Sequence, residues 1–350
     1  MSKKKKSKLE SIELAAQSGA AHEVVGRYGD AAKQHYVAYS GKDNEAGKTL
    51  KRGLKKTAES KVNPEYREQN IKQQAGFAAE DKYTARQNAE KIIKGEKTRI
   101  SRTDDLGRVN DPLYDHVLLD GEGIEIPGTG EQMKFVGSNP KACLAKLESE
   151  KFQKYLDADA TITVPSDYYE GIINEANARI QSLEKQLARA KENGNKELAD
   201  SISKKIEKVQ KIKDSVKDSG ITNEEAIFAR LHPKLSTAKD VVKISHRAGV
   251  EQAKIGALVG GGISMIKNIV AVSKGEKDAK TAAIDFAKDT GTGAVTAYAT
   301  AFAGSAIKGA MQNAGNSTLR TLSKSNAPAM MITSTIDIGK SMTRYFKGEI

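Results

Sequence analysis

The sequence predicts an α+β protein: a small mixed α/β unit, then a helical hairpin, then an all-α region rich in glycine and alanine. Three patterns predict this class. Two short apolar runs flank a glycine-rich turn in "LYDHVLLDGEGIEIPGTGEQMKFVGS", residues 113–138. A charged stretch with apolar residues three and four positions apart follows, and small residues then dominate. Early alternation of helix and strand, followed by helices alone, is typical of an α+β chain.

The α/β unit is predicted from its own order of elements. Residues 65–96 have a loose helical period, the hairpin covers about 113–137, a helix follows at 139–156, and "ATITVP" at 160–165 is a short strand. With this unit, the chain is predicted to have four parts. They are a basic N-terminal tail and helices (1–60), the α/β domain (61–165), an antiparallel helical hairpin (166–220), and a glycine- and alanine-rich helical domain (221–350).

The N-terminal part opens with four lysines, Lys3–Lys6. Glu10 and Glu13 interrupt the apolar segment that a signal peptide would need, so we interpret these lysines as a solvated tail able to contact phosphate.

Two apolar seams predict the helical hairpin. Residues 173–190 step by three and four, "ENGNKE" breaks the pattern, and residues 198–216 resume it. Such a charged two-helix arm is usually a spacer or a dimerisation element, so we expect a homo-oligomer through residues 167–219 as one outcome.

The C-terminal part begins with a capping box, Thr222 with Glu225. Further on, Thr290–Ile307 is a stretch of 18 residues without a charge, which reaches the lower limit for a membrane span. Small and hydroxyl residues dominate it, and Gly256 and Gly260 have the spacing of closely packed helices. Peripheral or soluble packing is favoured over a span.

Composition limits the class of partner and the compartment. The chain has 350 residues and a formal charge of +12, enough length for two or three domains and a charge that indicates an anionic partner. Nucleic acid and an anionic membrane surface are the candidates, and a basic protein without such a partner is the alternative. A single cysteine, Cys143, excludes an internal disulfide and indicates a reducing, cytoplasmic compartment, with membrane association left open. We expect Cys143 to be a core residue.

The predicted hairpin carries polar residues where a structural strand would be apolar. Alternation places Gln132 and Lys134 on one face, with Met133 and Phe135 on the other, facing the core. If Asp115 pairs on the same face, the three side chains converge. A carboxylate then holds Mg²⁺ (or Mn²⁺), the amide supplies an oxygen nearby, and the ammonium orients a water or neutralises a developing anion. His116 is expected on the opposite face. A solvated polar hairpin is the alternative.

This order of residues resembles the PD-(D/E)XK nuclease superfamily, in its variant with Gln in place of the middle acid. The matching residues are Glu80 in "GFAAED", Asp115 in "YDHVLL", and Gln132 and Lys134 in "EQMKF", and the resemblance covers about residues 70–165. It implies a restriction-endonuclease-like domain whose metal ligands are Asp115, Gln132 and Glu80, with Lys134 acting on the attacking water. Three other acids compete for the role of Asp115 or of the middle acid, namely Asp111, Asp120 and Glu131.

Basic residues surround this constellation and predict a phosphate-binding surface. Three precede the hairpin and four lie on the helix after it, in chain order Arg99, Arg102, Arg108, Lys141, Lys146, Lys151 and Lys154.

The favoured hypothesis is a magnesium-dependent endonuclease, bacterial or phage-associated, that hydrolyses nucleic acid, with DNA favoured. The alternative is a membrane-associating or pore-forming protein whose C-terminal helices insert without catalysis, or bind a partner protein. A third is an oligomeric structural protein that cuts nothing.

Overall fold

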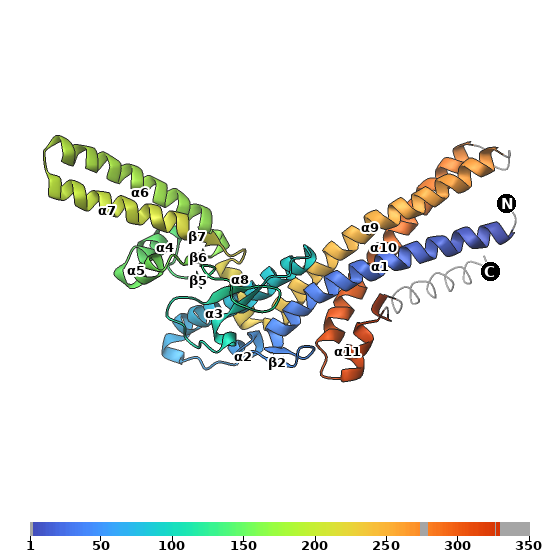
Figure 1. The fold of residues 1–350 in the computed structure, drawn as a ribbon, viewed down its shortest axis with the longest axis horizontal. Coiled ribbons are helices and arrows are strands. Elements are labelled where there is room, and N and C mark those ends of the chain that lie inside the picture. Colours follow the sequence, from blue (N-terminus) through green and yellow to red (C-terminus); the bar gives the residue numbers. More distant parts are fainter. Residues whose placement is uncertain (1–2, 274–278, 326, 330–350) are drawn as a thin grey trace.

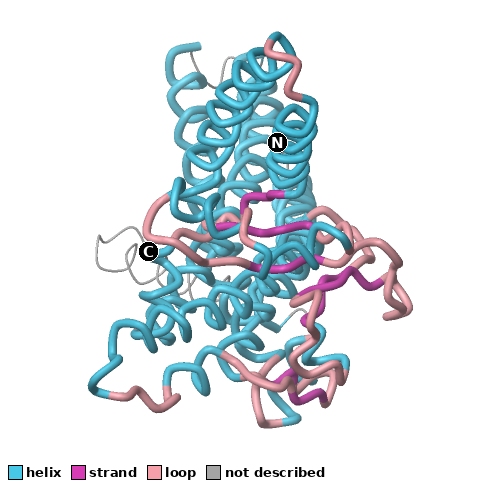
Figure 2. The backbone as a smooth tube through the Cα atoms, turned by 90° about the vertical axis from the view of Figure 1, so that its left-hand side faces the viewer, coloured by secondary structure: helices cyan, strands magenta, loops and turns pink. Residues whose placement is uncertain are grey.

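The computed structural model describes residues 3–273, 279–325 and 327–329, and it is an α+β fold (Figure 1). Helices make up most of the molecule, and the strands are few and short (Figure 2). A five-stranded sheet lies in the central region, from which two helical projections extend in different directions (Figure 1). One projection is formed by α6 and α7 and the other by α1, α9 and α10.

The five-stranded sheet has the spatial order β3-β4-β5-β6-β7, which is also its order along the chain. Neighbours among the first three strands are antiparallel, and β5, β6 and β7 are parallel. The strands are β3 (Arg99–Arg102), β4 (His116–Leu119), β5 (Glu131–Met133), β6 (Thr161–Val164) and β7 (Val216–Asp218). The chain crosses from β5 to β6 through α4 (Pro140–Leu147) and α5 (Glu150–Asp157), and from β6 to β7 through α6 (Ser166–Glu192) and α7 (Lys196–Ser215).

Each face of this sheet has its own apolar core. On one face Met133 and Ile100 pack with Tyr83 of α3 (Arg67–Ile93). On the other face Ile162 packs with the buried Cys143, in a core that α4, α5 and α6 complete. Because Met133 and Phe135 lie in the first core, the predicted alternation of β5 is confirmed, and so is the core position of Cys143.

Several elements differ from their predictions. The helix expected at 139–156 is two helices, because the chain breaks at Glu148 and Ser149. Strands β3 and β7 are additional to those expected. The N-terminal lysines, interpreted as a solvated tail, belong to the first turns of α1 (Lys3–Ser40).

The segment expected to form a helical hairpin contains α6 and α7, which pack against each other along a seam that buries Ala176, Ile202 and Val209. Gly194 in the connection has φ of +69°, a conformation that glycine adopts without strain. Because α7 ends directly in β7, the arm is fixed at its base to the sheet edge.

Long helices dominate the rest of the described chain. Helices α1, α9 (Pro233–Ser273) and α10 (Ala279–Gln312) pack together, and α8 (Asn223–Leu231) begins at the predicted cap, where the Thr222 hydroxyl accepts a hydrogen bond from Glu225 N at 3.1 Å. The shorter elements are β1 (Lys42–Asp43), β2 (Lys48–Thr49), α2 (Leu54–Ala58), two 3₁₀ helices at Pro64–Tyr66 and Thr103–Leu106, and α11 (Ser317–Ser323).

A network of buried ion pairs connects α3 to α8 and α9. Lys82 is almost wholly buried, pairs with Asp240 and donates a hydrogen bond to the Ser236 hydroxyl at 2.8 Å. Arg86 joins Glu225 and the same Asp240 carboxylate. The network sets the position of α3, the helix that carries Glu80.

No helix in the described part of the chain is long and apolar enough to cross a membrane. That part includes the backbone of α10, which contains Thr290–Ile307. The side chains around the predicted Gly256 and Gly260 contact, and residues 330–350, lie outside the described residues.

Candidate functional site

The register between β4 and β5 brings the predicted site residues together. His116 pairs with Glu131, and Asp115 N donates to Glu131 O at 2.9 Å, so the side chains of Asp115 and Gln132 project on the same face. The Gln132 amide donates a hydrogen bond to Asp115 Oδ2, and Met133 N donates to that oxygen at 2.8 Å. Both of these hydrogen bonds end on Oδ2, the same oxygen of the Asp115 carboxylate.

Lys134 lies on the same face as Gln132, just beyond the end of β5. Its backbone N–H donates to Thr163 O at 2.8 Å, which continues the pairing with β6. Its ammonium lies 4.8 Å from the ring centre of Tyr155 and 5.9 Å from that of Phe152, both on α5. These aromatic contacts hold the ammonium against α5, where the Asp115 charge still acts on its pKa.

Burial and mutual attraction act on this carboxylate and ammonium in opposite directions. Burial raises the pKa of Asp115, and the Lys134 charge opposes that shift. Burial lowers the pKa of Lys134, the Asp115 charge opposes that shift, and Lys154 and Lys151 lower the pKa further. Two groups with pKa values displaced in this way, at one end of a sheet, are typical of functional sites.

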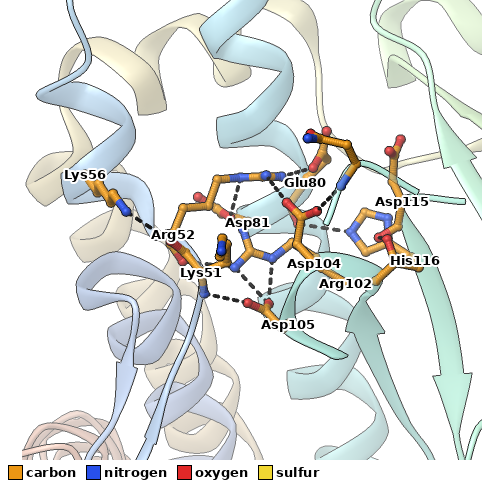
Figure 3. Close-up of polar contacts among 12 residues, drawn as sticks. Lys51, Arg52, Lys56, Glu80, Asp81, Arg102, Asp104, Asp105, Asp115 and His116 are labelled. Atoms are coloured by element: carbon orange, nitrogen blue, oxygen red, sulfur yellow. Dashed lines mark hydrogen bonds and ion pairs between the residues drawn. The ribbon is translucent and has the colours of Figure 1, made fainter. Parts of the chain in front are cut away.

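Glu80 lies on α3, which covers the face of the sheet opposite to Asp115 and Gln132, and its carboxylate is held by an arginine. Its carboxylate pairs with Arg52 Nη2, and Arg52 Nη1 lies 2.7 Å from Asp104 Oδ2. Arg52 and Asp104 both influence the pKa of Asp115, Arg52 by lowering it and Asp104 by raising it. Figure 3 shows the Arg52 guanidinium between Glu80 and Asp104, with Asp115 and His116 on the neighbouring strand. The described contacts of the Glu80 carboxylate are thus with Arg52, and none joins it to Asp115, Gln132 or Lys134.

The competing acids have other partners. Asp111 and Asp120 accept hydrogen bonds from backbone N–H groups of the turns that follow them. Glu131 projects on the α3 face, where it accepts from the Tyr83 hydroxyl at 2.6 Å and pairs with Lys217 at 2.7 Å. His116 is buried on that face too, edge-on to the Tyr83 ring, as predicted. Of these acids, Asp115 is the one that contacts Gln132 and lies on the same face as Lys134.

The seven predicted nucleic-acid-binding residues differ in accessibility. Lys141, Lys146, Lys151 and Lys154 are exposed. Arg108 is partly exposed and pairs with Glu125, and Arg99 is half-buried with its guanidinium on backbone carbonyls. The prediction for Arg102 is wrong: its side chain is 2% exposed because it neutralises the buried carboxylates Asp81 and Asp105.

Three residues that the sequence did not single out also belong to this region. Arg52 and Asp104 contact each other beside Glu80, and Tyr155 packs against Lys134. The sequence carried a signal for Asp104, because the pair Asp104–Asp105 is acidic within a basic stretch. Arg52 precedes Glu80 by 28 positions, and no local pattern links them.

The oxygen-bearing side chains at this end of the sheet are of the chemical type that a hard divalent cation prefers. Mg²⁺ in proteins is usually held by one or two carboxylates and retains several waters, and here Asp115 offers one carboxylate with the Gln132 amide beside it. In a separate network, four carboxylates (Glu80, Asp81, Asp104 and Asp105) pair with two guanidinium groups (Arg52 and Arg102). Within the described ranges, no three His, Cys, Asp or Glu side chains are grouped closely enough to hold a metal by themselves.

Comparison of the chain with protein-family models, with curated proteins and with solved structures finds no match. The function therefore has to be argued from the site itself.

Proposed function

We propose that this protein is a metal-dependent nuclease that hydrolyses phosphodiester bonds, with DNA as the favoured substrate. The observation that carries the proposal is that Asp115, Gln132 and Lys134 lie on one face at one end of the sheet, where Gln132 contacts Asp115 and the charges of Asp115 and Lys134 influence each other's pKa. The order of elements adds support: α3, three antiparallel strands, a helical crossover and a parallel strand accord with the restriction-endonuclease-like domain that the sequence resemblance implies.

Asp115 and Gln132 are the residues that would hold the cation. When bound, such an ion lowers the pKa of a coordinated water and stabilises charge that grows on a phosphate. Two N–H donors, the Gln132 amide and Met133 N, hold Oδ2 of Asp115 and so fix the orientation of its carboxylate. Gln132 is 3% exposed and fixes the rotamer of that carboxylate.

Lys134 would act on the reacting phosphate and the attacking water. Its ammonium is partly desolvated against the Tyr155 ring, so it would interact with a developing negative charge more strongly than a solvated lysine does. Burial lowers its pKa, which makes a proton easier to donate or withdraw there.

The exposed lysines of α4 and α5 would bind the nucleic-acid backbone. Lys151 and Lys154 are near enough to lower the pKa of Lys134. A phosphate chain bound along these side chains therefore passes the proposed reacting centre, and its affinity would fall with rising salt.

A cleavage assay with purified full-length protein tests the proposal. Double-stranded DNA, single-stranded DNA and RNA are incubated with Mg²⁺, with Mn²⁺ or with a chelator, using wild type and Asp115→Asn. We expect metal-dependent cutting, abolished by chelator and reduced about 10²-fold or more in Asp115→Asn, because the amide keeps the shape but lacks the charge that binds the cation.

Glu131→Gln is the matched control, because Glu131 lies on the opposite face of the adjoining strand and glutamine still accepts from the Tyr83 hydroxyl. It should cut at close to the wild-type rate. Absence of cutting on every substrate with either metal, or equal rates for wild type and Asp115→Asn, would reject the proposed function.

A further inference from the structure

A cavity of about 310 Å³ lies between α1, α3 and strand β3, beside the hairpin of β1 and β2. It is on the α3 face of the sheet, where Ile100 belongs to the core. Ile100, Val37, Leu50 and Leu119 give it apolar walls. A buried water needs only about 10–15 Å³ of such space, whereas small-molecule sites begin at about 300 Å³. The cavity is therefore large enough for a small organic ligand.

Two buried polar atoms of the cavity lining have no hydrogen-bond partner among the described residues, namely Asp81 Oδ2 and Arg52 Nε. The two side chains adjoin, since Arg52 Nε lies 3.6 Å from Asp81 Oδ1. Asp81 is 3% exposed, and its Oδ1 accepts a hydrogen bond from Arg102 (Figure 3). An acceptor and a donor thus lie side by side in the cavity wall, and leaving such atoms unpaired costs free energy.

The fold fixes the position of this donor. Nη1 of Arg52 lies 2.7 Å from Asp104 Oδ2, and Nη2 pairs with Glu80. The Arg52 carbonyl accepts from Arg102 Nη2 at 2.9 Å. Because both terminal nitrogens are held, Nε stays beside Asp81 before any ligand binds, which lowers the entropic cost of binding.

Positive charge lies at the mouth of the cavity, which is formed by Lys48 and Arg99. Lys48 of β2 is exposed, and Arg99 of β3 is half-buried. Nη1 of Arg99 donates to two backbone carbonyls at 2.6 and 2.7 Å, contacts that do not cancel its charge. Asp43 also lines the cavity, but it is paired with Lys33 at 3.2 Å. The mouth therefore suits an anionic group such as a phosphate.

The buried end of the cavity selects a neutral group with an N–H beside an acceptor atom. An ammonium would approach Asp81 against the charges of Arg52 and Arg102, and a carboxylate would approach Arg52 against the charge of Asp81. The edge of a nucleobase carries hydrogen-bond donors and acceptors side by side without a net charge. Its planar ring also fits between apolar walls.

We propose that this cavity binds a nucleoside monophosphate, with the base edge on Asp81 and Arg52 and the phosphate at Lys48 and Arg99. The inference is independent of the proposed nuclease function, because the cavity lies on the other face of the sheet from Asp115. Burial raises the pKa of Asp81, although Arg102 and Arg52 lower it. A further N–H donor on Oδ2 would stabilise the carboxylate and, with it, the folded protein.

Calorimetric titration and the shift in Tm measure binding, with full-length protein in a buffer that contains a chelator, so that nothing is cut. AMP, GMP, CMP and UMP are compared with ribose 5-phosphate and inorganic phosphate. We expect at least one nucleotide to bind about tenfold or more tightly than ribose 5-phosphate, because the sugar phosphate lacks the base edge that pairs with Asp81 and Arg52. That nucleotide should also raise the Tm.

Variants at the two ends of the cavity locate the bound nucleotide. Arg99→Gln should raise its Kd about tenfold and Lys48→Gln about three- to fivefold, because each removes a charge from the mouth. Lys42→Gln is the matched control and should leave the Kd unchanged, since Lys42 is exposed on the paired strand β1 and is not among the described lining residues.

Asp81→Asn should abolish the preference for the nucleotide over ribose 5-phosphate, because it changes the acceptor that reads the base. It also weakens the buried pair with Arg102, so its fold is checked by circular dichroism. If Asp81→Asn does not fold, the two variants at the mouth decide the test.

Three results would overturn the inference. The cavity holds water only if no nucleotide binds. It reads no base if ribose 5-phosphate or inorganic phosphate binds as tightly as every nucleotide. The nucleotide binds elsewhere if Arg99→Gln and Lys48→Gln behave like wild type. Each result leaves the nuclease proposal as it was, because cleavage at Asp115 is tested separately with metal.

Discussion

Replacement of Lys134 by methionine is expected to lower the metal-dependent cleavage rate by about 10²–10³-fold, the usual loss when one preorganised charge-stabilising donor is removed. Methionine keeps an unbranched stem against Tyr155 and Phe152, so the packing of α5 should persist. The rate is measured under single-turnover conditions with saturating Mg²⁺. Far-UV circular dichroism and the urea midpoint report whether the fold is retained.

Lys217→Met is the control for that experiment. Lys217 lies on β7 of the same sheet, but it faces α3, pairs with Glu131 and is 44% exposed. Its replacement should change the cleavage rate by no more than about twofold, as for most surface substitutions. If both lysine variants lose the same share of the cleavage rate, the loss comes from damage to the sheet. If Lys134→Met cuts at the wild-type rate, Lys134 has no role in cleavage.

Arg102→Ala is expected to destabilise the protein by about 3–5 kcal/mol, because it leaves two buried carboxylates without their main counter-charge. The side chains of Arg102, Asp81 and Asp105 are 2%, 1% and 3% exposed. Urea unfolding followed by circular dichroism gives the free energy. The loss arises from uncompensated charge, since the Arg102 pKa stays raised by Asp81 and Asp105 despite burial.

Arg108→Ala provides the comparison, since Arg108 lies in the same stretch but its ion pair with Glu125 is about 40% exposed on both sides. We expect a change of about 0–1 kcal/mol there, as for other surface pairs. A cost for Arg102→Ala no larger than that for Arg108→Ala would contradict the buried network.

Local patterns predicted the parts of the fold that obey a simple period. Alternation placed Gln132 and Lys134 opposite Met133, and the Thr222–Glu225 cap marked the start of α8, because each depends on residues only a few positions apart. Strand β7 was missed because Val216 continues the helical spacing of α7 directly before it.

Interactions between distant segments were beyond such patterns. Strand β3, "RISR", is polar in sequence, and Arg102 is buried only because Asp81 and Asp105 are folded against it. Because such long-range contacts cannot be read from local patterns, Arg102 was wrongly predicted to bind nucleic acid and Arg52 was not singled out. A charge run does not distinguish an exposed arginine from one that is neutralised inside the protein.

Double-mutant kinetics gives the most direct test of the central claim that Asp115 and Lys134 act as one centre. The metal-dependent cleavage rate is measured for Asp115→Asn, Lys134→Met and the double variant. Residues that act as a unit lose their effects together, so the account predicts that the double variant is no slower than the slower single variant. Losses that multiply in the double variant, or single variants that cut at the wild-type rate, would contradict it.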